Sequence, residues 1–192
     1  MIYTLIGSRE TPEEILTILE KFAYKAASLG YIGRSGGAGG ADTCLEVGVT
    51  SYLKDKSLSD NYKNDLMEVY LPWKDFNGRV SSEAGYYTLK ELPMQHEAYK
   101  LAEEIHPAWD RCSQGAKALH ARNTMQVLGK DLNSPSRFIL CYGKSVTEGS
   151  VIPKGGTATA CRLGEKHEVQ IFNLYLDEHL QRVTKWLEET SD

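Results

Sequence analysis

Short runs of consecutive apolar residues alternate along this chain with longer segments in which apolar residues recur every three or four positions. The short runs predict five buried strands, over residues 2–6, 31–34, 67–71, 138–142 and 169–173. The longer segments predict helices over about 12–29, from about residue 42, over about 95–105 and 115–128, after the turn at 154–156, and over about 176–187. The first helix has the clearest start, because Thr11 can cap it and Pro12 suits the first helical position.

An order in which strands alternate with helices favours parallel strands joined by right-handed crossovers. The sequence therefore predicts an α/β fold, a Rossmann-like, doubly wound and mainly parallel sheet with helices on both faces. The 192 residues fit one nucleotide-binding domain spanning 1–192. The stretch at about 72–93 lacks clean periodicity and contains Asn77-Gly78, so we expect it to be an irregular insertion.

Two glycine-rich turns are the most informative local features. Arg34-Ser-Gly-Gly-Ala-Gly-Gly-Ala-Asp42 follows the second predicted strand, and Lys154-Gly-Gly-Thr-Ala-Thr-Ala160 lies downstream of the fourth. Glycines allow positive φ and leave N–H groups open to a ligand, and the helix that follows favours an anion at its N-terminus. One such turn can be a tight connection and nothing more. Two of them, at the carboxyl edge of a parallel sheet, predict a cleft for a phosphate-bearing ligand.

Two common nucleotide-binding motifs are missing. The turn after the first strand reads Gly7-Ser-Arg-Glu10 where a dinucleotide-binding fold would have Gly-x-Gly-x-x-Gly. The full P-loop pattern, Gly-x-x-x-x-Gly-Lys-Ser/Thr, does not occur either. The sequence thus argues against an ordinary nicotinamide or flavin dehydrogenase and against a P-loop enzyme.

The two turns together resemble motifs of the SLOG superfamily, which includes DNA-processing DprA proteins, LOG phosphoribohydrolases and sensor domains for nucleotide-derived signals. The resemblance rests on Ser35-Gly-Gly-Ala-Gly-Gly-Ala-Asp42 and on Gly155-Gly-Thr-Ala-Thr-Ala160, and it covers residues 7–174. It is greatest to short DprA-like recombination-mediator proteins of bacteriophages. It implies a Rossmann-like nucleotide-binding fold, which by itself hosts several functions.

The LOG enzymes also resemble this chain at Leu119-His-Ala-Arg-Asn-Thr-Met125, which is similar to their Met-His-x-Arg-Lys-x-x-Met. Their Gly-Gly-x-Gly-Thr-x-x-Glu motif carries a glutamate that works with the arginine to cleave an N-glycosidic bond. In this chain Arg162 stands at the position of that acid, and a guanidinium would repel an oxocarbenium-like transition state. The resemblance therefore implies ligand binding through Arg122 and argues against hydrolysis, unless Glu165, one turn later, supplies the acid.

These observations give one set of expected ligand-binding residues: Gly7, Ser8, Arg9, Arg34, Ser35, Gly36, Gly37, Asp42, Trp73, Arg122, Asn123, Gly155, Gly156, Thr157 and Thr159. Arg9 and Arg34 are expected to clamp phosphates, the alternative being solvated surface positions. Asp42 either binds a ribose hydroxyl or caps its helix. Trp73 either stacks on a base or packs against the protein. No catalytic residue is predicted.

Composition and net charge narrow the range of candidate binding partners. The net charge of −4 and the pI near 5.8 argue against a long nucleic acid as a partner and in favour of a small ligand. No apolar run approaches the length of a membrane span and no leader is recognisable, so we expect a cytoplasmic protein, in the host cytoplasm if a phage encodes it. The four cysteines are widely spaced and the histidines follow no known metal motif, so we expect no metal and no cofactor. The resemblance implies a homo-oligomer.

The sequence leaves three functions open. The leading hypothesis is a protein that binds a small nucleotide-derived ligand without turnover, for example to sequester a host immune messenger such as a cyclic nucleotide or an ADP-ribose derivative. The first alternative is a LOG-like nucleotide N-glycosidase, which would need a carboxylate within reach of Arg122. The second is DprA-like binding of single-stranded DNA, which would show a steep salt dependence.

Overall fold

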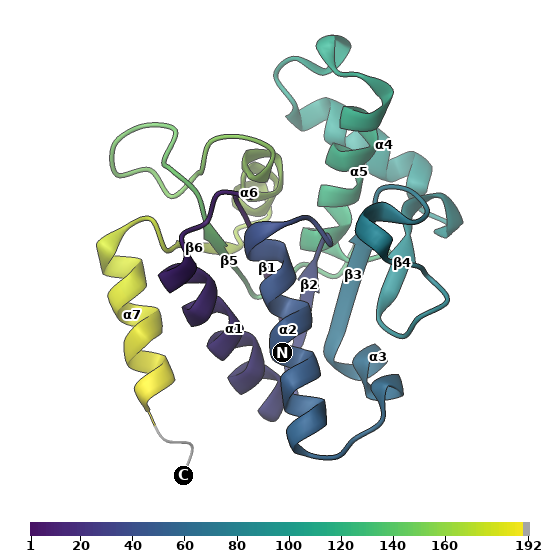
Figure 1. The fold of residues 1–192 in the computed structure, drawn as a ribbon. Coiled ribbons are helices and arrows are strands. Elements are labelled where there is room, and N and C mark those ends of the chain that lie inside the picture. The colour runs from purple at the N-terminus through teal and green to yellow at the C-terminus, as the bar shows by residue number, and fades with distance from the viewer. Residues whose placement is uncertain (190–192) are drawn as a thin grey trace.

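The computed structural model describes residues 1–189, and its centre is a six-stranded sheet in which every neighbouring pair of strands is parallel (Figure 1). The strands are β1 (Ile2–Gly7), β2 (Ile32–Ser35), β3 (Met67–Leu71), β4 (Tyr86–Thr88), β5 (Phe138–Tyr142) and β6 (Gln170–Asn173), and their order across the sheet is β4-β3-β2-β1-β5-β6. The chain starts in the middle, builds outward through β2 to β4, and then returns to the other side of β1. The strand order therefore reverses between β1 and β5, where doubly wound sheets bind their ligands.

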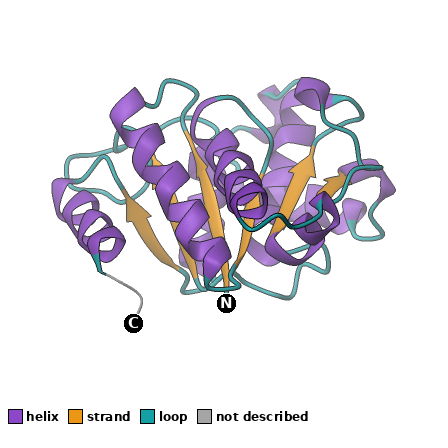
Figure 2. Ribbon diagram, turned by 60° about the horizontal axis from the view of Figure 1, so that its bottom comes forward, coloured by secondary structure: helices purple, strands orange, loops and turns teal. Residues whose placement is uncertain are grey.

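Helices cover both faces of the sheet (Figure 2). They are α1 (Glu13–Ser28), α2 (Thr43–Asp55), α3 (Lys63–Leu66), α4 (Gln95–Ile105), α5 (Gln114–Leu128), α6 (Thr157–Lys166) and α7 (Asp177–Glu188). The core clusters place α1, α2 and α7 on one face and α4, α5 and α6 on the other. This arrangement confirms the predicted Rossmann-like α/β fold. Within residues 1–189, none of the helices combines the length and the apolar character that a membrane crossing requires.

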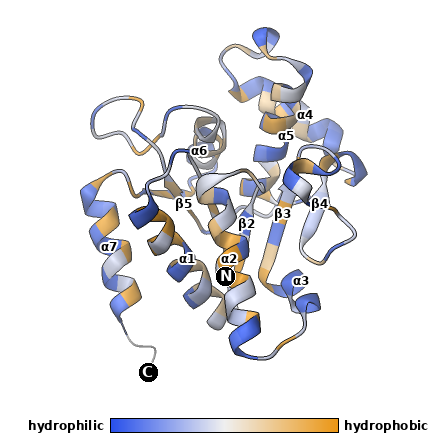
Figure 3. Ribbon diagram, in the orientation of Figure 1, coloured by the Kyte–Doolittle hydropathy of each residue, from blue (hydrophilic) through white to orange (hydrophobic). Residues whose placement is uncertain are grey.

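Alternating side chains of β1 supply both halves of the core. Leu5 packs with Leu19 of α1, whereas its neighbour Ile6 packs with Val127 of α5 and Leu163 of α6. Successive side chains of a strand point to opposite faces, so a strand that is buried on both sides reads as a continuous apolar run. The outer helices have a different hydrophobic pattern. Helix α7 alternates between hydrophobic and hydrophilic positions (Figure 3), because only one of its faces contacts the core.

The structure contains two short elements that the sequence pattern did not predict. The stretch expected to be an irregular insertion, 72–93, contributes the edge strand β4, whose Tyr86 pairs with Val69 of β3. Residues 63–66, for which the sequence pattern predicted no element, form the single-turn helix α3. Elements of three or four residues are too short for a periodic pattern, and β4 is fixed by its pairing with β3, which local sequence does not encode.

Close packing of α1 against α2 gives the first testable prediction. A Cβ atom at Gly48 of α2 would lie 2.4 Å from Cβ of Ala23 and 2.7 Å from the carbonyl oxygen of Glu20, both in α1. Alanine ordinarily stabilises a helix interior by about 1 kcal/mol over glycine, but this clash forces the two backbones apart, which typically costs about 1–3 kcal/mol. We expect Gly48→Ala to lower the free energy of unfolding by about 1–2 kcal/mol, measured by urea denaturation.

The matched control is Gly115→Ala in the first turn of α5. A Cβ there would meet no atom closer than 3.9 Å, so this variant should be neutral or slightly stabilising. Equal unfolding midpoints for the two variants would contradict the packing argument.

Candidate ligand-binding cleft

A cleft of about 380 Å³ lies at the carboxyl edge of the sheet, where β1 and β2 end. Four segments line it: the end of β1 with the turn after it, the turn after β2, one side of α5, and the turn that opens α6. The lining residues are Ile6, Gly7, Ser8, Arg9, Glu10, Ala38, Asp42, Ala116, Leu119, His120, Arg122, Asn123, Gln126, Lys154, Gly155, Gly156 and Thr157. Parts of both glycine-rich turns thus face one cleft.

Asp42 joins the turns after β1 and β2. Its Oδ1 accepts the N–H of Gly7 at 3.1 Å, and its Oδ2 accepts the N–H of Ala38 at 3.4 Å. The side chain makes no cap of α2, so the helix-capping alternative for Asp42 is wrong. Burial raises the pKa of the Asp42 carboxyl, while the positive charge of Arg122 and the two N–H groups oppose that rise.

Arg122 fixes α5 to the ends of two strands. Its Nη1 donates to the carbonyl oxygens of Gly36, just after β2, and of Tyr70 in β3, the latter at 3.2 Å. Its Nε donates to Oδ1 of Asn123 at 3.1 Å. The guanidinium carbon lies 5.6 Å from the centre of the Phe76 ring. Burial lowers the pKa of Arg122 to about 10, and the charge of Asp42 opposes that shift, so the guanidinium stays positively charged at neutral pH.

One nitrogen of Arg122 is left for a ligand. Among the residues that the structure describes, Nη2 has no hydrogen-bond partner and no carboxylate lies within 4 Å of the guanidinium. Within the same residues, the only fully buried polar side-chain atom without a partner is Oγ of Ser145. Nη2 is therefore not fully buried, and Arg122 is one of the residues that line the cleft. A charged donor in this state favours an anionic acceptor.

The turn that opens α6 supplies backbone donors. Gly155 adopts a positive φ of 86°, and the carbonyl of Gly156 accepts the side-chain amide of Asn123 at 3.0 Å. No side chain caps the N-terminus of α6, so its first N–H groups remain available. Lys154 also lines the cleft and has an exposed side chain. Sequence reasoning omitted this lysine from the site, although its position directly before Gly155-Gly156 was a usable signal.

His120 of α5 also lines the cleft and was not among the expected binding residues. Its Nδ1 lies 3.0 Å from Oγ1 of Thr159, a buried residue of α6 that was expected to bind ligand. The structure places Thr159 behind His120 and not on the cleft surface. Burial lowers the pKa of His120 to about 4, and the charges of His106 and Arg122 add to this effect, so its ring is neutral at pH 7.

Arg34 is not part of the cleft, which corrects the expectation that it clamps a phosphate. Its Nε forms an ion pair with Oε2 of Glu68 at 2.8 Å, and its Nη1 donates to the carbonyl oxygen of Ser134 at 2.5 Å. The Arg34 side chain is 3% exposed, so it is not a solvated surface residue either. The physical reason is strand geometry: the side chain leaves β2 toward the C-terminal end of α5, away from the carboxyl edge.

The neighbours of Arg34 support the cleft from behind without lining it. The hydroxyl of Ser35 donates to the carbonyl of Asp42 at 3.2 Å. A Cβ at Gly36 would lie 2.2 Å from Nη1 of Arg122, so a glycine is required there by the buried arginine. Gly37 adopts a positive φ of 66°. The expected role of these residues in ligand contact is thus replaced by a structural one.

Trp73 also lies outside the lining. Its ring packs edge-on against Phe76 at 5.2 Å, and its side chain is 42% exposed beside the first turn of α5. It thus stands near Ala116, which does line the cleft. The structure favours the packing alternative for Trp73 over base stacking.

The two residues on which the hydrolysis argument depended are both exposed. Arg162 and Glu165 lie on α6, and neither side chain lines the cleft. The carboxylates that do line it are Asp42 and Glu10.

Comparisons with known proteins give one distant likeness. No protein-family model and no curated protein sequence matches the chain. A solved structure of DNA processing protein A from Helicobacter pylori, described for its unique single-stranded DNA binding mode, is similar with a TM-score of 0.41 and 13% sequence identity. The match covers 100% of this chain and 82% of that chain.

The expectation that a long nucleic acid is not a partner is not supported by this comparison, because the similar structure belongs to a protein described as binding single-stranded DNA. A net charge of −4 averages over the whole surface, whereas ligand binding depends on the local charge of one cleft.

The buried ion pair of Arg34 gives the second prediction. Replacing Arg34 by Met leaves Glu68, only 17% exposed, without its cation. Breaking a buried pair on one side typically costs about 3–5 kcal/mol. We expect Arg34→Met to lower the free energy of unfolding by about 3 kcal/mol in urea denaturation.

Arg137→Met is the matched control, because Arg137 is exposed and has no carboxylate within 4 Å among the described residues. This variant should change stability by less than about 0.5 kcal/mol. A loss below about 1 kcal/mol for Arg34→Met would refute the structural role assigned to it.

Proposed function

We infer that the cleft binds the phosphate group of a nucleotide-derived ligand. The observation that carries this proposal is Arg122, a buried and charged residue of the cleft lining whose Nη2 has no partner in the described chain. A phosphate oxygen is a suitable acceptor for that donor, since charge-assisted hydrogen bonds are among the strongest in proteins.

The surroundings of Arg122 suit the same anion. Gly156 and Thr157 at the uncapped N-terminus of α6 offer N–H groups, and the helix dipole adds positive potential there. The exposed side chains of Arg9 and Lys154 stand at the mouth of the cleft and can complete a phosphate clamp. The acidic side chains in the lining are Asp42, already bonded to two N–H groups, and Glu10.

The size of the cleft favours a mononucleotide unit. Small-molecule pockets usually span about 300–1,000 Å³, and this cleft holds about 380 Å³. A free nucleotide and one nucleotide of a single strand share the phosphate chemistry that Arg122 would recognise. The experiment therefore includes both sources.

Binding without turnover is the more specific form of the proposal. Both oxygens of Asp42 accept backbone N–H groups, so this carboxylate has a structural task, and the position aligned with the LOG glutamate holds Arg162. A protein of this kind would act by holding its ligand, as a sensor or a sequestering protein does.

The third prediction tests the phosphate clamp. Titration calorimetry with adenosine monophosphate and with a 5′-phosphorylated oligothymidylate should detect binding of at least one of them. Arg122→Lys, which keeps the charge and removes Nη2, and Lys154→Ala should each weaken it by at least about tenfold, because a hydrogen bond to a charged group contributes about 1.5–3 kcal/mol.

Lys144→Ala is the control, since Lys144 lies on the same loop as Lys154, is exposed and does not line the cleft. It should bind as the parent protein does. If only the oligonucleotide binds, and its affinity falls steeply as the salt concentration rises, the strand is identified as the ligand. Failure of both probes to bind, or unchanged affinity in Arg122→Lys and Lys154→Ala, would overturn the proposal.

The fourth prediction concerns hydrolysis, the activity that a carboxylate beside Arg122 could support. Because burial raises the pKa of Asp42, this residue is the candidate acid of the cleft. We expect chromatography to recover adenosine monophosphate, NAD and cyclic nucleotides intact after incubation with the protein. Release of free base that is abolished in a folded Asp42→Asn variant would instead establish an N-glycosidase.

A further inference from the structure

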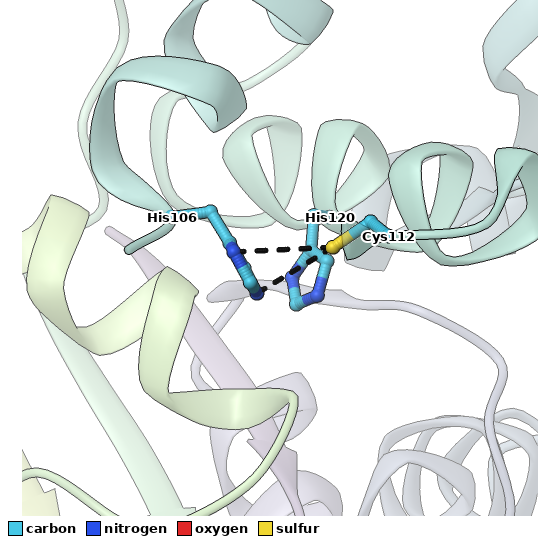
Figure 4. Close-up of side chains that lie close together, drawn as sticks. All are labelled: His106, Cys112 and His120. Atoms are coloured by element: carbon cyan, nitrogen blue, oxygen red, sulfur yellow. Dashed lines mark hydrogen bonds between the residues drawn. The ribbon is translucent and has the colours of Figure 1, made fainter. Parts of the chain in front are cut away.

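Three potential metal ligands meet beside the cleft although they are separated in sequence. His106 follows the last residue of α4, Cys112 follows a short 3-10 helix (Trp109–Arg111), and His120 lies within α5. One ligand atom from each lies within 4.8 Å of the other two, and Figure 4 shows the three side chains converging. All three residues are partly buried, so an ion from solvent can reach them.

We propose that His106, Cys112 and His120 bind a Zn²⁺ ion through one nitrogen of each ring and the thiolate sulfur. Sγ of Cys112 lies 3.8 and 3.9 Å from the two ring nitrogens of His106, and the centres of the two imidazole rings are 4.4 Å apart. Tetrahedral zinc, with Zn–N of about 2.0–2.1 Å and Zn–S of about 2.3 Å, places its ligand atoms about 3.3–3.6 Å apart. Small side-chain rotations therefore bring the three atoms into coordinating positions.

The donor set selects the metal. Two imidazoles and one thiolate suit zinc and similar transition metals, whereas magnesium and calcium need oxygen ligands. On binding, the Cys112 thiol releases its proton to solvent and the sulfur takes the metal in its place. The N–H of Ala108 now donates to Nδ1 of His106 at 3.1 Å, and coordination through that nitrogen would replace this bond.

The neighbours of the cluster help to position it. Oγ1 of Thr159 lies 3.0 Å from Nδ1 of His120, and such a contact fixes the orientation of the ring. Three protein ligands leave the fourth zinc position for water or another oxygen, the arrangement of zinc sites that interact with a ligand. Because His120 lines the cleft, that fourth position lies at the cleft wall.

The proposal does not depend on phosphate binding in the cleft, and its test contains no nucleotide. Untagged protein, fully reduced with a phosphine, is titrated with Zn²⁺ in a calorimeter and with Co²⁺ in a spectrophotometer. We expect one ion per chain. Co²⁺ should give a thiolate-to-metal charge-transfer band together with the intense visible bands of tetrahedral coordination.

Ligand variants decide whether the ion sits at this cluster. Cys112→Ser should lose the charge-transfer band, and Cys112→Ser and His106→Gln should each bind Zn²⁺ at least roughly a hundredfold more weakly, because loss of even an outer partner costs about 10–100-fold. His96→Gln, an exposed histidine of α4, is the matched control and should bind as the parent does.

Circular dichroism of each variant without metal shows whether it is folded. A functional three-ligand site should be filled at a Zn²⁺ concentration of about 100 μM. Folded parent protein that binds no Zn²⁺ at this concentration would overturn the proposal. Equal Zn²⁺ affinity and an unchanged Co²⁺ spectrum in Cys112→Ser would overturn it as well.

Discussion

Two buried residues of opposite charge hold the carboxyl edge of this sheet together. Arg122 bonds the carbonyls of Gly36 and Tyr70, at the ends of β2 and β3, and Asp42 bonds the N–H groups of Gly7 and Ala38 after β1 and β2. Turns at this edge end in unpaired backbone groups, and a charged side chain satisfies them more strongly than a neutral one. The shape of the cleft follows from these bonds, because each of them fixes one wall relative to another.

Helix α5 contributes more polar side chains to the lining of the cleft than any other segment does. It presents His120, Arg122 and Asn123 within about one turn, and the half of the helix from Ala121 onward is buried on nearly every side. Polar side chains enter such a setting only when they have partners. Arg122 and Asn123 have theirs in backbone carbonyls and His120 has Thr159, while Nη2 of Arg122 has no partner among the described residues.

The proposed zinc ligands and the proposed phosphate donor therefore share one rigid helix. His120 and Arg122 are two residues apart on α5, and the pKa of His120 is lowered partly by the charge of Arg122. An ion at the histidine–cysteine cluster would add positive charge to the same wall of the cleft. Metal and anion binding would then reinforce one another, since each ligand supplies charge that the other favours.

The sequence by itself determined the alternation of strands and helices and the parallel sheet, because these follow from local periodicity. It also determined that parts of both glycine-rich turns face one cleft, because parallel strands share a carboxyl edge. Only the tertiary structure decided the rest. It turned Arg34 inward to Glu68, added the three-residue strand β4, and placed Glu165 outside the cleft. It also gathered His106, Cys112 and His120 at one point. Each of these outcomes depends on which side chains and strands meet across the fold, and contacts between distant segments leave no periodic trace in the chain.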